Sequence, residues 1–150
     1  MRVVIQRTIE ASVTIDRQVV SSIGQGLLIL VGIENGDAAE DAQWLAGKIV
    51  GMRIFADADD KMNLNVKDIA GGLLVVSQFT LHGASKKGTR PSFIRAARPE
   101  QAIPLYEQFL AFLETELGSS VQRGVFGADM KVALINDGPV TILMDSKARE

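Results

Sequence analysis

Cysteine is absent from this chain of 150 residues, and histidine occurs once, at position 82. The lack of cysteine excludes disulfides, thiol catalysis and zinc sites built on thiolates. A single histidine also excludes any site that needs several histidine ligands from one chain. We therefore expect the protein to work without a metal ion and without another cofactor.

Long apolar runs are also missing. No stretch reaches the roughly 18 apolar residues of a membrane-spanning helix, and the N-terminal residues alternate instead of forming the apolar core of a signal peptide. With 47% apolar and 23% charged residues, the composition is typical of a globular protein. These observations predict a cytoplasmic protein without membrane contact, folded as a single domain over residues 1–150.

The net charge is only −2, but the basic residues are unevenly distributed. The stretch 83–99 is rich in Gly, Ser and Pro, contains no Asp or Glu, and holds five of the 16 basic residues. These are Lys86, Lys87, Arg90, Arg95 and Arg98. A solvated surface loop and a loop that contacts phosphate groups both fit this pattern, and composition leaves both interpretations open.

Hydrophobic spacing predicts a mixed α/β fold with the element order β(2)-(βα)2-β(3) and two main helices packed against the sheet. Residues 2–7 and 12–23 alternate as strands, and the second segment is expected to form a hairpin that turns near Asp16. Residues 26–33 and 73–81 are continuous apolar runs, which are typical of buried strands. Three more strands are expected over 120–126, 131–136 and 140–145.

Two segments carry apolar residues at helical spacing. The first predicted helix covers 38–54, with Asp37 as its N-cap and Glu40 three residues later, as in a capping box. The second covers 99–117 and begins with a proline, which is favoured in a first turn. Between the helices, residues 57–72 are polar and rich in turn formers, and we expect a loop there.

Three polar residues interrupt the end of the second buried strand: Ser77, Gln78 and Thr80. The ends of central strands are common places for binding crevices, and buried polar groups need hydrogen-bond partners. These residues either form the polar floor of a pocket or simply alternate outward and bond locally. A hydrolase triad with His82 is disfavoured, because the Cα atoms of Thr80 and His82 would lie roughly 7 Å apart along a strand.

A Gly-Pro pair, Gly138-Pro139, separates the last two apolar runs within "LINDGPVTILM". Proline donates no backbone N–H, so it is restricted to strand starts, edges and bulges. Only about 5–6% of X–Pro bonds in folded proteins are cis. The pattern alone therefore favours a trans hairpin turn over residues 136–138, with Pro139 opening the next strand.

Four segments, in order, resemble the bacterial-type D-aminoacyl-tRNA deacylases, once called D-tyrosyl-tRNA deacylases. They are "MRVVIQR" at 1–7, "SQFTL" at 77–81, "KKGTRPSF" at 86–93 and "NDGPVT" at 136–141. The resemblance covers essentially the whole chain. It implies a tRNA-binding proofreading hydrolase that cleaves the ester between a D-amino acid and tRNA, and a homodimer with its active sites at the subunit interface.

The resemblance also implies roles for individual residues. Ser77, Gln78, Phe79 and Thr80 would form the catalytic pocket for the aminoacyl-adenosine end of the tRNA. Gly138 and Pro139 would form a cis-proline motif that enters the partner's pocket and provides chiral selectivity. Phe126 and Met130 would line the adenosine site. The charge pattern of the basic loop, and not the resemblance, suggests that Lys86, Lys87 and Arg90 contribute to substrate binding. His82 receives no role.

The sequence shows no evident general base for this hydrolysis. Backbone N–H groups near Phe79 and Thr80 can stabilise the negative charge that develops on the carbonyl oxygen. Thr80 can act as a nucleophile only if a neighbouring group activates it, and no such group is apparent. The resemblance favours a route in which Thr80 only orients the substrate and the ribose 2′-hydroxyl of the tRNA helps to activate water.

Chiral selectivity would come from repulsion. Backbone carbonyls of Gly138-Pro139 beside the substrate's Cα would accept the hydrogen of a D-residue and clash with the side chain of an L-residue. Such a filter would not reject glycyl-tRNA. The alternative function is a non-catalytic tRNA- or RNA-binding module that uses the basic loop and Phe93 as a stacking platform.

Overall fold

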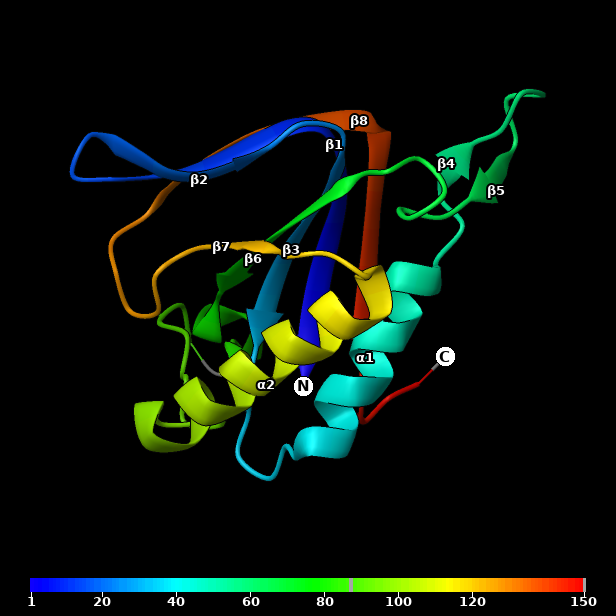
Figure 1. The fold of residues 1–150 in the computed structure, drawn as a ribbon. Coiled ribbons are helices and arrows are strands. Elements are labelled where there is room, and N and C mark those ends of the chain that lie inside the picture. Colours follow the sequence, from blue (N-terminus) through cyan, green and yellow to red (C-terminus); the bar gives the residue numbers. More distant parts are fainter. Residues whose placement is uncertain (87, 150) are drawn as a thin grey trace.

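The computed structural model describes residues 1–86 and 88–149, and it shows a single mixed α/β domain. Six strands form one twisted sheet in the order β2-β1-β3-β6-β7, with β8 paired to the other edge of β1. Two helices, α1 (Ala39–Gly51) and α2 (Pro99–Leu117), lie side by side on one face of this sheet (Figure 1). The predicted fold class and the two helices are confirmed.

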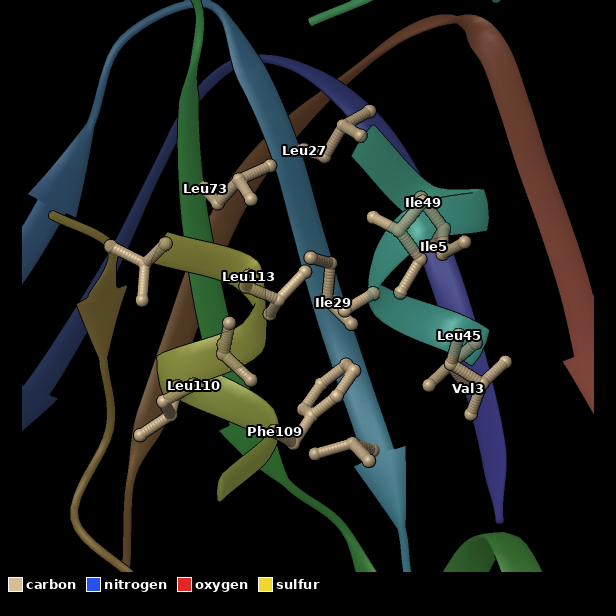
Figure 2. Packing of buried hydrophobic residues seen from close by; sticks show 14 of the residues in the cluster. Val3, Ile5, Leu27, Ile29, Leu45, Ile49, Leu73, Phe109, Leu110 and Leu113 are labelled. Carbon is tan, nitrogen blue, oxygen red and sulfur yellow. The ribbon is translucent and has the colours of Figure 1, made fainter. Parts of the chain in front are cut away.

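The parallel strands β3 (Gly26–Gly32) and β6 (Gly72–Ser77) form the centre of the sheet. Their alternate side chains are buried on both faces, which explains the continuous apolar runs in the sequence. Leu27, Ile29 and Leu73 pack under the helices against Phe109 and other side chains of the main core (Figure 2). A smaller cluster on the opposite face contains Leu28, Leu74 and Val76.

Two long strands replace segments that the sequence predicted as separate. β1 (Arg2–Ile15) is continuous, and it turns through Asp16 and Arg17 into β2 (Gln18–Ile23). Both turn residues have positive φ, 49° and 66°, as the predicted tight hairpin requires. β1 pairs first with β3 and then with β2 on one edge, and with β8 on the other.

β8 (Lys131–Asp145) is a single strand of 15 residues, where two strands and a hairpin turn were predicted. In the ladder with β1, Gln6 pairs with Thr141 and Thr8 pairs with Asn136. Only Arg7 of β1 therefore lies opposite the four residues 137–140, and these four residues bulge out of the ladder. The Gly138-Pro139 bond inside this bulge is cis, so the trans hairpin interpretation is wrong.

The remaining differences are local. The predicted loop 57–72 contains part of a small hairpin of β4 (Phe55–Ala56) and β5 (Met62–Leu64). The strand expected over 120–126 is reduced to β7 (Gln122–Arg123), because only two residues pair with β6. No helix among the described residues combines the length and the apolar character needed to cross a membrane.

The start of α1 differs from the predicted capping box. Asp37 is not the N-cap, because its carboxylate accepts a hydrogen bond from the buried α-ammonium group of Met1 at 2.6 Å. Ala38 is the N-cap and has no side-chain oxygen to offer. Its backbone N–H donates to Asp41 Oδ2 at 2.9 Å, so Asp41 takes the role that was predicted for Glu40. The helix ends at residue 51 instead of 54.

Asp41 should stabilise the fold in a pH-dependent way. Burial alone would raise the pKa of Asp41, but hydrogen bonds from Lys147 Nζ (2.7 Å) and from the Ala38 N–H lower it from 3.8 to about 2. Because the folded-state pKa lies below the unfolded-state value, the stabilisation is complete above pH 4 to 5 and is lost as the pH falls towards 2. We expect Asp41→Asn to lower the free energy of unfolding by about 2 kcal/mol at pH 7 and by about half as much at pH 3.

Urea unfolding of both proteins at the two pH values measures this difference. Lys147→Met is the matched variant, since it removes the donor and leaves the carboxylate. It should reduce the pH dependence of stability between pH 3 and 7. An Asp41→Asn effect of equal size at both pH values would show that the carboxylate's charge does not contribute.

Candidate functional site

The end of β6 turns into a short 3₁₀ segment, η1 (Phe79–His82), where the sequence predicted strand to residue 81. The backbone N–H of Gln78 donates to the Val31 carbonyl at 2.7 Å and ends the pairing with β3. Gly32 then lies directly under η1, because a Cβ there would come 3.0 Å from the Gln78 carbonyl oxygen. The missing side chain at Gly32 thus lets η1 pack onto the end of β3.

A cavity of about 300 Å³ lies beside this turn. It is bounded by the ends of β3 and β6, by the start of α2, and by the segment 126–132. The structure brings five of the predicted site residues together in its lining: Ser77, Gln78, Phe79, Phe126 and Met130. Segments far apart in the sequence therefore meet at the polar end of the central strand, and of the two interpretations that the strand-end pattern left open, Ser77 and Gln78 fit the pocket.

Thr80 lies next to the cavity instead of in its lining. Its side chain is exposed, and its hydroxyl oxygen accepts a hydrogen bond from the Gln78 side-chain amide. Among the described residues that line the cavity, Asp129 is the one with an ionisable side chain. Its carboxylate is exposed and binds Lys131 Nζ at 2.9 Å. The cavity thus presents mainly apolar side chains, amides and hydroxyls to a ligand.

The wall opposite η1 depends on two residues that the sequence did not single out. Tyr106 of α2 donates its hydroxyl proton to the Val75 carbonyl at 3.1 Å, and its ring lies 6.0 Å from that of Phe126. Burial raises the pKa of Tyr106, so the hydroxyl keeps its proton. The backbone N–H of Gly124 donates to the same carbonyl at 2.9 Å.

Gly124 also sets the position of Met130. A Cβ on Gly124 would come 2.5 Å from Met130 Sδ, so a side chain at residue 124 would displace the end of the methionine from its present position. Nothing in the sequence marks either supporting residue. Tyr106 falls at ordinary helical spacing for a core position, and Gly124 stands in a segment that was predicted to be a strand.

His82 is buried and lies outside the cavity lining. Neither ring nitrogen has a hydrogen-bond partner, and Nδ1 lies 3.9 Å from Glu34 Oε2. Glu34 is instead bound by the Arg95 guanidinium through two hydrogen bonds, at 3.0 and 2.6 Å. The hydrogen bonds and the charge of Glu34 raise the pKa of Arg95. Arg95 of the basic loop is thus already paired with a carboxylate of its own chain. Within residues 1–86 and 88–149, no three His, Asp or Glu side chains gather as metal ligands.

The basic loop is closed by an antiparallel bridge between Ala84 and Ser92, with N···O distances of 2.8 and 2.9 Å. Lys86 and Arg90 lie within it, and both are exposed. Lys87, the third predicted residue, lies outside the described residues. The loop that carries these two basic residues follows η1 directly in the chain.

Gly138 and Pro139 do not line the cavity of their own chain; they are exposed on the bulge of β8. Arg7 braces this bulge from β1. Its Nε donates to the Asp137 carbonyl at 3.2 Å, and its Nη1 donates to the Ile54 carbonyl at 2.6 Å. The Asn136 side chain accepts the Val140 N–H at 3.1 Å from the other side. The bulge is therefore a fixed projection.

Comparison with known proteins agrees with these motifs. The model of the family described as D-Tyr-tRNA(Tyr) deacylase matches residues 4–145. D-aminoacyl-tRNA deacylases of Flavobacterium psychrophilum and Porphyromonas gingivalis are 63% and 61% identical to this chain, each over the full length of both chains.

Two solved structures share this fold. A structure titled c-Myc DNA Unwinding Element Binding Protein matches with a TM-score of 0.92 and 38% identity, over 99% of this chain and 100% of the other. The fold is also shared with a probable eukaryotic D-amino acid tRNA deacylase, with a TM-score of 0.80 and 17% identity over 95% and 97% of the two chains. From the family match over nearly its whole length and from relatives above 60% identity, it follows that this chain belongs to the D-Tyr-tRNA(Tyr) deacylase family.

Proposed function

We propose that this protein hydrolyses the ester bond that joins a D-amino acid to the 3′ end of a tRNA, with residues 1–150 acting as one deacylase domain. The observation that carries the proposal is the cavity of about 300 Å³ between the β6–η1 segment and Phe126 with Met130. An aromatic ring and a polarisable thioether on one wall suit a nucleobase. Backbone and amide groups on the other wall suit an ester.

The oxyanion of the reaction would be bound by backbone N–H groups. Phe79 and Thr80 are the first residues of η1, where N–H groups have no acceptor within the turn. Gln78 and Ser77 precede them at the cavity wall. Donors of this kind typically change a rate by ~10²–10³ each.

The attacking water would be activated by the substrate. The cavity lining offers no histidine, cysteine or lysine among its described residues, and Asp129 is bound to Lys131 on the surface. The hydrogen bond found for the Thr80 hydroxyl within the described part of the chain comes from the Gln78 amide, which is a donor and not a base. We therefore assign Thr80 an orienting role and the base-like role to the ribose 2′-hydroxyl. This scheme requires neither a metal ion nor another cofactor.

Chiral selectivity would come from a second copy of the chain. Gly138-Pro139 is exposed on a braced bulge and does not line the cavity of its own chain, so in a homodimer it would enter the cavity of the partner. Exposed apolar side chains on the same strand support such an interface, with Leu134 and Ile135 exposed by 37% and 49%. The carbonyls of the motif would face the substrate's Cα, reject L-residues and leave glycyl-tRNA as a substrate.

Lys86, Lys87 and Arg90 would contact the phosphates of the acceptor end of the tRNA. The enzyme would work in the cytoplasm on charged tRNA.

The test of this function is single-turnover hydrolysis of one tRNA that carries either the D or the L form of the same amino acid. We expect rapid release of the D form only. Release of both forms would mean that the protein is an esterase without the proposed chiral selection by Gly138-Pro139. Tight binding of the tRNA without release of either amino acid would indicate a non-catalytic RNA-binding module.

A further inference from the structure

Two exposed phenylalanine rings meet at the mouth of the cavity. Phe79 lines the cavity and is 56% exposed, while Phe93, which follows the basic loop, is 36% exposed. Their centroids are 5.1 Å apart and their planes are inclined by 77°, an edge-to-face contact. Solvent-exposed aromatic pairs are unusual on a protein surface, because large apolar rings are normally buried.

The backbone around Phe93 holds its ring in place. A Cβ on Gly83 would come 3.1 Å from Phe93 Cε1, so the ring lies directly over the glycine backbone. The bridge between Ala84 and Ser92 ends one residue before Phe93, and the Phe93 carbonyl accepts the Ala96 N–H at 3.0 Å. The ring is thus positioned in advance, which lowers the entropy lost on binding a ligand.

The chain segment that carries this pair has charges of one sign. No Asp or Glu occurs between residues 69 and 99 of the sequence. Lys86 and Arg90 are exposed on the loop that leads into Phe93, and exposed Arg98 follows it at the start of α2. A flat aromatic surface beside cations matches the chemistry of unpaired nucleotides, which offer a base to stack and a phosphate to bind.

We propose that Phe93, together with the edge of Phe79, is a stacking site for the unpaired nucleotide that precedes the terminal adenosine of the tRNA. The inference rests on the proposed function, because it assumes that the adenosine occupies the cavity. A cavity of about 300 Å³ cannot also hold the next nucleotide, so the strand must leave across the mouth. Phe93 is not among the residues that line the cavity, so this site acts on tRNA affinity.

The test compares two substrates of the Phe93→Ala variant. With D-aminoacyl-tRNA, we expect kcat/KM to fall by about 5- to 100-fold, mainly through KM, since one stacked base is lost. With D-aminoacyl-adenosine, which lacks the preceding nucleotide, kcat/KM should stay within about twofold. Phe93→Tyr should restore the tRNA value. Ile94→Ala is the matched control, because Ile94 is the next residue and is 86% exposed but cannot stack.

Salt dependence tests the charged part of the site. Arg90→Gln should reduce the slope of log affinity against log salt by about 0.7 for one lost phosphate contact to a single strand. Lys48→Gln, on the exposed side of α1, should leave the slope unchanged. If the Arg90→Gln variant has the same salt dependence of affinity as the wild-type protein, Arg90 does not bind a phosphate of the tRNA and this part of the proposal is wrong.

Three results would overturn the stacking site. Equal losses on both substrates would mean that Phe93 only supports the cavity, and no loss on tRNA would mean that it binds nothing. If the Phe93→Ala variant self-associates more weakly than the wild-type protein in analytical ultracentrifugation, the Phe93 ring is part of a contact between subunits instead of a nucleotide site. If the wild-type protein cleaves neither substrate, the proposed function fails separately, and the effect of Phe93→Ala on the dissociation constants of uncharged tRNA and adenosine still decides the inference.

Discussion

Replacing the 2′-hydroxyl of the terminal adenosine with hydrogen should slow hydrolysis of a D-aminoacyl-tRNA by about 10²- to 10⁴-fold, the usual contribution of a positioned acid–base group. The reason lies in the composition of the cavity. Its one ionisable side chain among the described lining residues is Asp129, which is exposed and bound to Lys131. With no base from the protein, removal of the substrate's hydroxyl removes the group that activates water.

The matching protein variant is Thr80→Val, which keeps the shape of the side chain and removes its hydroxyl. We expect a loss of less than about tenfold, because Thr80 is exposed and its hydroxyl accepts a hydrogen bond from Gln78 instead of donating to a base. Single-turnover rates for both changes decide between the two routes. A nearly unchanged rate with the 2′-deoxy substrate, together with an inactive Thr80→Val enzyme, would make Thr80 the nucleophile.

Gly138→Ala should lower either the D-over-L selectivity or the affinity for the D substrate by about 10²-fold, the size of effect expected when a positioned group moves by about 1 Å. Gly138 has φ +121°, which L side chains rarely adopt, and an added Cβ would come 2.9 Å from Arg7 Nη2. The new methyl group must displace either the bulge or the arginine that braces it. Rates with D- and L-aminoacyl-tRNA, measured on one tRNA, check the prediction.

Gly118→Ala is the control for backbone strain alone. Gly118 ends α2 with φ +81° and has open space at its Cβ position, so this variant should lose stability without losing selectivity. Unchanged selectivity and affinity in Gly138→Ala would contradict the filter.

Mixed dimers test whether the motif acts across subunits. A Gly138→Ala subunit has an intact cavity, whereas a Met130→Trp subunit has an intact motif and a filled cavity. If the motif acts in the partner's cavity, mixing the two variants should create one site per heterodimer that combines an intact cavity with an intact motif, and this site should have the native D-over-L selectivity and affinity. Absence of recovery after subunit exchange would place the motif's effect within its own chain.

Local patterns predicted the centre of this fold. Apolar runs identified β3 and β6, and helical spacing identified both helices, because buried strands and amphipathic helices each require a distinct periodicity. The pattern at the end of β6 left open whether Ser77, Gln78 and Thr80 form a pocket floor or face outward; Ser77 and Gln78 line a cavity, whereas Thr80 lies beside it. These features depend on residues that are near one another in the chain.

Features decided by distant partners could not be predicted from local patterns, and the cis Gly138-Pro139 bond was expected only from the family resemblance. Asp37 looks like an N-cap, and only the fold brings Met1 to it. The Gly-Pro pair looks like a turn because turns and bulges use the same residues; the long partner strand β1 makes it a bulge. Gly124 supports Met130 through a contact that no spacing rule expresses.

The bulge of β8 has a consequence for how such a protein can change. Both halves of the strand pair with β1, on either side of residues 137–140, so the ladder does not depend on the conformation between them. A different loop of similar length can therefore be grafted between Asn136 and Thr141 while the sheet keeps its register. Evolution or protein engineering can in this way change the ligand that residues 137–140 contact, while the pairing of β8 with β1 stays the same.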